Sequence, residues 1–127
     1  MEEIIKICKH VIECMVNDNY ELLEIEGALE RVSERDIKRV LHEYNPDENI
    51  IIPPEEYYKK IYVNKYNDGS GYHVDVDLLY YSGRSDLTLQ LDLRQKEENE
   101  LEVIIDDLRV LWIFCFDKGV STGPIIV

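Results

Sequence analysis

Apolar positions in the first part of the chain recur with the period of an α-helix. From Ile4 to Val16 they fall three and four residues apart, which places them on one face of a helix. A second, short helical segment is predicted over residues 20–25, and Gly27 then interrupts it. The pattern therefore predicts two helical segments at the start of the chain, each with one buried side.

The clearest helix start lies at Ser33. Its hydroxyl can cap a helix, and Asp36 stands three residues later in the position of the capping box. Apolar residues over 37–44 keep the helical spacing, and Asn45-Pro46 ends the helix because the residue before proline avoids the helical region. A further helix of one or two turns is predicted over residues 55–60, opened by a proline.

Beyond residue 60 the apolar period changes to two, which is typical of half-buried β-strands. Strands are predicted over 61–66, 72–81, 87–94 and 101–112, with turns at 67–71, 82–85 and 95–99. The apolar phase slips by one residue across Asp106-Asp107 in the last strand. We expect a β-bulge there, because a bulge absorbs such a slip.

The order of helices followed by strands predicts an α+β fold. A four-stranded antiparallel meander needs a cover on its apolar face, and the N-terminal helices are the cover that the chain offers. A cone-like arrangement of the cystatin or NTF2 type is one candidate. The length predicts a single domain over residues 1–127, with a helical layer (1–52), a sheet (53–116) and a C-terminal tail (117–127).

The last predicted strand is too apolar to lie in water. Apolar residues run without a break from Val110 to Phe116, and exposing them would create a large apolar patch, which soluble monomers avoid. We expect Trp112 and Phe114 to be mostly buried. We also expect a homodimer or partner contact through the strand around Trp112, with the tail folding back against it.

The charge of the chain excludes some partners. Lys and Arg number 14 and Asp and Glu number 27, so the formal net charge is −13. A field of this sign repels phosphate backbones, which argues against nucleic-acid binding. The same field favours a basic protein partner.

Two further features predict where the protein works. The start, Met1-Glu2-Glu3-Ile4, lacks the basic and apolar regions of a secretory signal, and no apolar run approaches the roughly 18 residues of a membrane helix. The three cysteines are too sparse for a disulfide scaffold. We expect a cytoplasmic protein with reduced thiols and no membrane contact.

Cys8, His10 and Cys14 resemble a metal-binding pattern at first sight. On a helix they point to different sides, so they cannot close a tetrahedral site without distant help. No G-x-S-x-G or C-x-x-C motif is present in the chain. The sequence therefore predicts no metal, no cofactor and no catalytic residue.

Carboxylates gather on the polar face of the predicted sheet. Asp75, Asp77 and Asp92 share that face if the second and third strands pair in the simple hairpin register, and Asp106 and Asp107 lie at the bulge. Such a cluster costs free energy unless a cation or a basic group balances its charge. The alternatives are a divalent ion, glycosidase-type chemistry, a basic protein partner, or a solvated face screened by salt.

Tyrosines concentrate around the first two strands. Tyrosine is enriched at interfaces, so Tyr72, Tyr80 and Tyr81 join the five aspartates in the predicted partner-binding set; the alternative is that they line the edge of the core. Arg84 and Asp86 flank the turn into the third strand and are predicted to form a structural ion pair. A pairing of Arg84 with an aspartate at the bulge is the alternative.

Two segments carry a resemblance to a known family. Residues 83–89, GRSDLTL, and residues 105–111, IDDLRVL, look like the paired signature of a small uncharacterised bacterial domain family, and Asn19-Tyr20-Glu21 and Pro53-Pro54 are similar to its upstream elements. The resemblance covers residues 10–111 and brings no activity with it. Small acidic members of that family resemble immunity proteins of bacterial toxin systems, including contact-dependent growth inhibition.

The leading functional hypothesis is an acidic, non-enzymatic binding protein that neutralises a cognate toxin. Its acidic surface would steer and then cover a basic groove on the toxin. The first alternative is a small-molecule-binding or enzymatic domain that uses a pocket in a cone-shaped sheet, with polar groups such as His73 or Asp107. The second is an oligomer whose exposed sheet is a self-interface.

Overall fold

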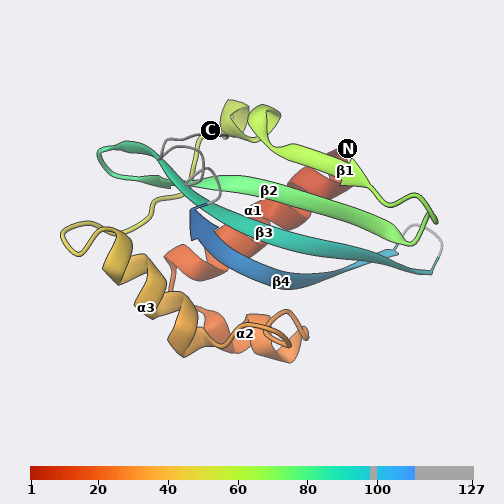
Figure 1. The fold of residues 1–127 in the computed structure, drawn as a ribbon, viewed down its shortest axis with the longest axis horizontal. Helices are drawn as coiled ribbons and strands as arrows, with labels where there is room; N and C mark the ends of the chain where they lie inside the picture. Colours follow the sequence, from red (N-terminus) through yellow and green to blue (C-terminus); the bar gives the residue numbers. More distant parts are fainter. Residues whose placement is uncertain (98–99, 111–127) are drawn as a thin grey trace, which may run out of the picture.

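The computed structural model describes residues 1–97 and 100–110. The helices are α1 (Glu2–Val16), α2 (Tyr20–Ile25) and α3 (Glu34–Tyr44), with a 3-10 helix, η1 (Glu55–Lys60); the strands are β1 (Tyr62–Lys65), β2 (Gly71–Tyr80), β3 (Gly83–Glu97) and β4 (Glu100–Val110). The strands form one antiparallel sheet in the order β1-β2-β3-β4 (Figure 1). The predicted α+β fold, with N-terminal helices on a four-stranded meander, is confirmed.

Local signals set the helix boundaries as predicted. The Ser33 hydroxyl oxygen accepts a hydrogen bond of 3.1 Å from the backbone N–H of Asp36, which caps the start of α3. Asn45 has an extended backbone and ends the helix just before Pro46. Pro54 is the N-cap of η1.

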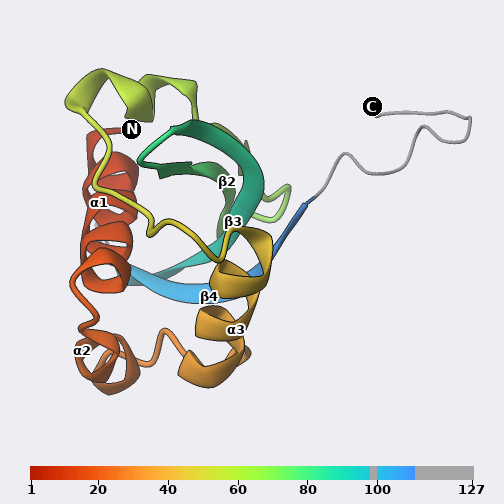
Figure 2. The ribbon, with the colours of Figure 1, turned by 90° about the vertical axis from the view of Figure 1, so that its left-hand side faces the viewer.

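The sheet curves around α1, which lies on its concave face (Figure 2). The helix places an apolar stripe against alternate residues of the central strands, so one continuous core forms between the two layers. From α1 the buried residues are Ile4, Cys8, Val11, Ile12, Cys14 and Met15, and from β2 and β3 they are Val74, Val76, Leu78, Tyr80, Leu87, Leu89, Leu91 and Leu93. The space inside the curved sheet is therefore filled by side chains.

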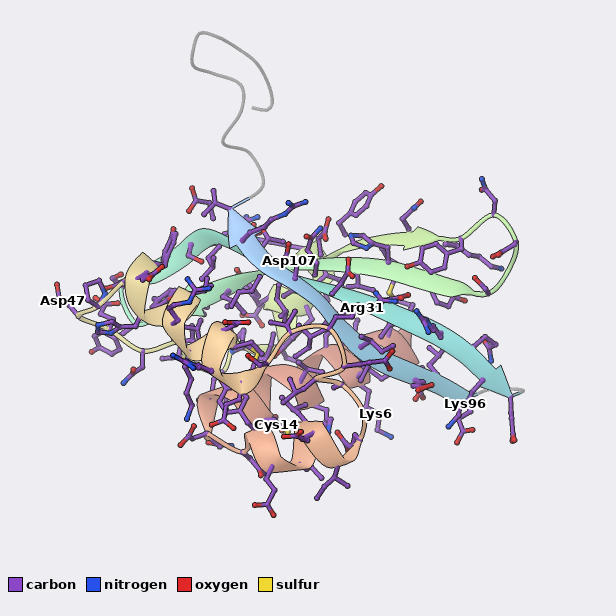
Figure 3. The ribbon with its side chains drawn as sticks, turned by 60° about the horizontal axis from the view of Figure 1, so that its bottom comes forward. Lys6, Cys14, Arg31, Asp47, Lys96 and Asp107 are labelled. Carbon is purple, nitrogen blue, oxygen red and sulfur yellow. The ribbon has the colours of Figure 1, made fainter. Side chains whose placement is uncertain are left out.

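The connector between α2 and α3, residues 26–33, runs beside β4. The carbonyl oxygen of Ala28 accepts a hydrogen bond of 2.9 Å from the backbone N–H of Ile105, and Ala28 itself is buried. Figure 3 shows Arg31, from the same connector, beside the middle of β4. This connector therefore covers part of the edge of the sheet.

The strand register departs from a regular ladder in two places that matter for the polar face. In β4, Gln90 faces Asp107 and Leu91 faces Ile105, so Asp106 is the extra residue of a bulge, as predicted. Between β2 and β3, the pairs Asp77 with Thr88 and Leu79 with Arg84 leave β3 with two extra residues. The hairpin itself closes with Tyr80 opposite Gly83, so the prediction of a turn over 82–85 was wrong by about two residues.

Several predictions fall outside the described residues. They are the continuation of the last strand to Trp112, the burial of Trp112 and Phe114, and the tail over 117–127. The finer assignment to a cystatin or NTF2-type fold stays a prediction. No helix in the described part of the chain is long and apolar enough to cross a membrane.

Candidate functional site

The face of the sheet that points away from α1 carries the predicted aspartates. Direct cross-strand partners lie on the same face of a sheet, and the register pairs His73 with Asp92, Asp75 with Gln90, and Asp77 with Thr88. Asp107 joins this face opposite Gln90. We call this surface the outer face. The prediction that Asp75, Asp77 and Asp92 share one face is confirmed.

Asp92 is the most enclosed carboxylate of the outer face, since its side chain is only 10% exposed. Its Oδ1 accepts a hydrogen bond of 2.8 Å from the hydroxyl of Tyr66. Its Oδ2 lies 3.1 Å from Nη1 of Arg31 and 3.2 Å from Nε of Arg94. Two guanidinium groups and a phenol therefore satisfy this carboxylate, and it has little capacity left for a partner.

The bulge aspartates also have partners. Arg31 bridges Asp92 and Asp106, because its Nη1 lies 2.8 Å from Oδ1 of Asp106. Asp107 accepts a hydrogen bond of 2.8 Å from the backbone N–H of Leu108, and its Oδ2 lies 3.5 Å from Nε of Arg109. The side chain of Asp107 is 46% exposed, so water screens this ion pair.

Asp75 lies beside a histidine on the same strand. Nε2 of His73 is 2.7 Å from Oδ1 of Asp75, and Nε2 of Gln90 donates to the same oxygen at 3.3 Å. Both His73 and Asp75 are about three-quarters covered. Among the described residues, no hydroxyl or thiol that could act as a nucleophile is hydrogen-bonded to this pair.

Arg84 does not pair with Asp86, so that prediction was wrong. Arg84 donates from Nη2 to Oδ2 of Asp77 at 2.6 Å, and the hydroxyl of Thr88 donates to the other oxygen of Asp77 at 2.7 Å. Asp86 instead accepts a hydrogen bond from the hydroxyl of Tyr44 in α3. The cause is the two extra residues in β3, which bring Arg84 diagonally opposite Asp77 and carry Asp86 out of the ladder.

The three predicted tyrosines occupy different environments. Tyr80 is 2% exposed, stacks on Tyr44 and donates to the carbonyl oxygen of Leu41, so it belongs to the core and the prediction of a docking role for it was wrong. Tyr72 is half-buried and packs against the core. Tyr81 lies in the hairpin turn and is 83% exposed.

Two contacts of the outer face were not predicted from the sequence. Tyr66 lies between β1 and the turn that follows, and Arg31 lies in the helix connector, so both reach Asp92 only through tertiary packing. Burial, followed by the hydrogen bond to Asp92, raises the pKa of Tyr66 to about 12. No periodic signal in the chain predicts either contact.

The outer face is close to electrically balanced. Arg31, Arg84, Arg94 and Arg109 pair with four of its five predicted aspartates, and His73 lies beside the fifth, Asp75. The face therefore contributes little to the net charge of −13. Most of the net negative charge therefore lies on carboxylates elsewhere on the molecule.

A histidine, a thiol and a carboxylate meet at the surface of α1. Nε2 of His10 lies 2.8 Å from Oε1 of Glu26 and 3.9 Å from Sγ of Cys14. A catalytic triad needs these contacts on opposite ring nitrogens, whereas here both use Nε2. Burial, followed by the charges of Glu26 and Glu13, raises the pKa of the Cys14 thiol, which is the opposite of nucleophile activation.

Neither a metal centre nor a sheet pocket stands out. The described residues contain no group of three or more His, Cys, Asp or Glu side chains placed to hold a metal ion. A cavity of about 360 Å³ lies between α1, α3 and the end of β2, but Lys38 in its wall is already paired with Asp18 and Glu34. His73 and Asp107, which the pocket alternative required, lie on the outer face instead.

A groove of about 420 Å³ runs between α1 and the first half of β4. Ile7, Leu101 and Val103 form its apolar part, and Glu3, Glu26 and Glu102 line it together with Lys6 and His10. Figure 3 shows Lys6 on the α1 side of this edge. We call this feature the α1–β4 groove. It combines half-buried apolar side chains with more carboxylates than ammonium groups.

These features define a class of protein: a helix-on-meander domain with a self-neutralised outer face and an acidic groove at one sheet edge. A family model described as "Domain of unknown function (DUF7668)" matches residues 12–111. The match covers most of the chain, so the chain belongs to this family. No curated protein and no solved structure matches it.

Proposed function

We propose that this protein is a non-enzymatic binding protein for a basic protein partner. The observation that carries the proposal is the separation of charge: arginines pair with four of the five aspartates of the outer face, whereas the α1–β4 groove is lined by more carboxylates than ammonium groups. A net charge of −13 supports fast association with a basic surface. The raised pKa of Cys14 and the geometry at His10 argue against a thiol enzyme.

We infer further that the partner is a cognate toxin and that the protein acts as an immunity protein in the cytoplasm of the producing cell. Small acidic members of the family that residues 83–89 and 105–111 resemble are similar in size and charge to immunity proteins of toxin systems, and this similarity supports the step. Toxins that act on nucleic acids carry basic substrate grooves, and an acidic protein can cover such a groove. Contact-dependent growth inhibition is the system that we favour.

Growth rescue tests the immunity role. The chain is co-expressed with the C-terminal domain of a large secreted protein encoded immediately beside its gene, and survival is compared with expression of that domain alone. Rescue by this chain, with no rescue by an unrelated protein of equal charge, supports the proposal. A toxic neighbouring domain that kills equally in both cultures overturns it.

The contact surface is tested separately, by association kinetics with the captured partner. Reversal of Asp107 and Asp75 tests the outer face, and reversal of Glu3 and Glu26 tests the groove. Since the outer face is balanced by arginines, we expect the groove variants to slow association more and to flatten its salt dependence. Equal rates for all four variants would remove the electrostatic argument.

A further inference from the structure

Among the described residues, the first part of the β4 edge, residues 100–103, has no backbone partner on its outer side. In an antiparallel strand, alternate residues direct both their N–H and C=O groups to the same side. The N–H of Ile105 points outward, because it bonds to Ala28 of the connector. Val103 and Leu101 lie two and four residues before Ile105, so their N–H and C=O groups also point outward. Within residues 1–97 and 100–110, no hydrogen bond is made to these outward groups.

The connector therefore stops short of this part of the edge. It covers the strand at Ile105, whereas residues 100–103 border the open α1–β4 groove. Unpaired strand edges are templates for a further strand, and proteins commonly protect them with charges, bulges or covering loops. Here the cover ends where the groove begins.

The side chains beside this edge alternate in chemistry. Leu101 and Val103 point to the α1 side, where they meet Ile7 in the groove, and Glu102 points to the outer side opposite Arg94. Glu3 adds a carboxylate on the α1 side of the groove. An added strand would find an apolar surface on one of its faces and carboxylates along the borders.

We propose that an extended basic segment of the partner pairs with residues 100–103 of β4 as a fifth strand. Its aliphatic side chains lie on Ile7, Leu101 and Val103, and its lysine or arginine side chains face Glu102 on the outer side, while Glu3 adds to the negative potential of the groove. Main-chain hydrogen bonds give affinity in this mode of binding, and the alternating side chains give specificity. The inference rests on the proposed function, because it names the surface and the chemistry of the same partner.

A second copy of this chain fits the edge less well. Pairing of β4 with β4 would bring the acidic residues Glu100 and Glu102 of two chains together along the same edge. Like charges across a strand pair are destabilising. Charge complementarity therefore favours a basic segment over self-association.

The first experiment uses synthetic peptides as probes of the full chain. A fluorescent hexapeptide of alternating valine and lysine is compared with its valine–glutamate counterpart by fluorescence anisotropy. We expect the basic peptide to bind and the acidic peptide not to bind, and we expect amide hydrogen exchange at Leu101 and Val103 to slow when the basic peptide is added. Unchanged exchange at both amides overturns the proposal.

Backbone methylation separates strand pairing from charge attraction. One version of the basic peptide carries N-methyl groups on the odd residues and another carries them on the even residues. Only one set of N–H groups can face β4, so one version should bind and the other should lose at least about tenfold in affinity. Equal binding by both versions overturns strand addition and leaves the acidic binding protein of the proposed function standing.

Matched variants locate the peptide on the protein. Glu3→Gln with Glu102→Gln should weaken binding about fivefold, whereas Glu21→Gln with Glu24→Gln, which makes the same charge change on exposed residues of α2, should leave it unchanged. Equal weakening by the two pairs would mean that only net charge matters, and would overturn the proposed site.

A proline pair tests the edge itself. Val103→Pro removes one outward N–H from β4, and Val63→Pro removes one from β1 at the opposite edge of the sheet. The N–H of Val63 points outward because the N–H of Tyr66, three residues later, points inward and bonds to the carbonyl oxygen of Gly71. Only the β4 variant should lose peptide binding. If that variant does not fold, hydrogen exchange of the native chain decides the question, and a concentration-dependent dimer through β4 would contradict the basic occupant.

Discussion

Replacing Asp92 by asparagine tests whether the outer face is held together by charge. The substitution keeps the shape of the side chain and removes its negative charge from a position that is 10% exposed. Tyr66, Arg31 and Arg94 then face a neutral amide. We expect the free energy of unfolding to fall by about 2 kcal/mol, the sum of what these three contacts contribute.

The two guanidinium groups are partly in water, with side-chain exposures of 34% for Arg31 and 47% for Arg94. Solvent screens both ion pairs, so each contributes about 0.5 kcal/mol. The hydrogen bond from Tyr66 is enclosed and charge-assisted, and loss of the charge costs about 1 kcal/mol more. Asp106 continues to pair with Arg31, which limits the total.

Urea unfolding followed by far-UV circular dichroism measures the change, with the m value expected to stay constant. Asp107→Asn is the matched control: it makes the same chemical change on the same face, but its side chain is 46% exposed, so we expect less than about 0.5 kcal/mol. Asp92→Asn should also move the pKa of Tyr66 down from about 12, because it removes an anionic hydrogen-bond acceptor. If both variants lose the same stability, the burial argument for Asp92 is wrong.

Three further outcomes follow from the fold. Gly71→Ala should cost more than about 2 kcal/mol in urea unfolding, because a Cβ would lie 1.9 Å from the carbonyl oxygen of Leu93. Gly69→Ala carries only the backbone strain of its φ of +76°, about 1 kcal/mol, because it meets no atom within 4 Å; equal costs would contradict the close approach. Ser33→Ala should cost about 1 kcal/mol through loss of the α3 cap, and an unchanged midpoint would show that the cap adds nothing. Burial raises the pKa values of four tyrosines from 10.0 to about 12: Tyr20, Tyr58, Tyr66 and Tyr80. The stability that these protonated tyrosines contribute should be complete below pH 10, and the free energy of unfolding should fall as the pH rises toward 12. A free energy of unfolding that stays constant over that range refutes this.

The elements that could be predicted from the sequence are those whose signal is local. The helical spacing from Ile4 to Val16, the cap at Ser33 and the two-residue period of β2 and β3 each follow from neighbouring side chains. The bulge was also predictable, because the alternation of apolar residues shifts by one position at Asp106-Asp107. Together these signals were enough for the α+β fold and for the shared face of the aspartates.

The contacts that could not be predicted depend on register and on long connections. Two extra residues in β3 place Arg84 beside Asp77, and no apolar phase slip marks them because an insertion of two residues leaves a two-residue period unchanged. Arg31 reaches Asp92 from a connector distant in sequence. Residues 100–103 of β4 lack a partner among the described residues because the connector bonds the strand at Ile105, and the apolar period does not predict where the connector lies.

The position of α1 in the chain has a consequence for how the protein is made. The helix carries one side of the core, yet its packing partners, β2 and β3, come from the later half of the sequence. During synthesis its apolar stripe therefore leaves the ribosome long before the strands that bury it. We expect the helix to depend on chaperones or on loose collapse in that interval, and the core to close only once β3 has emerged.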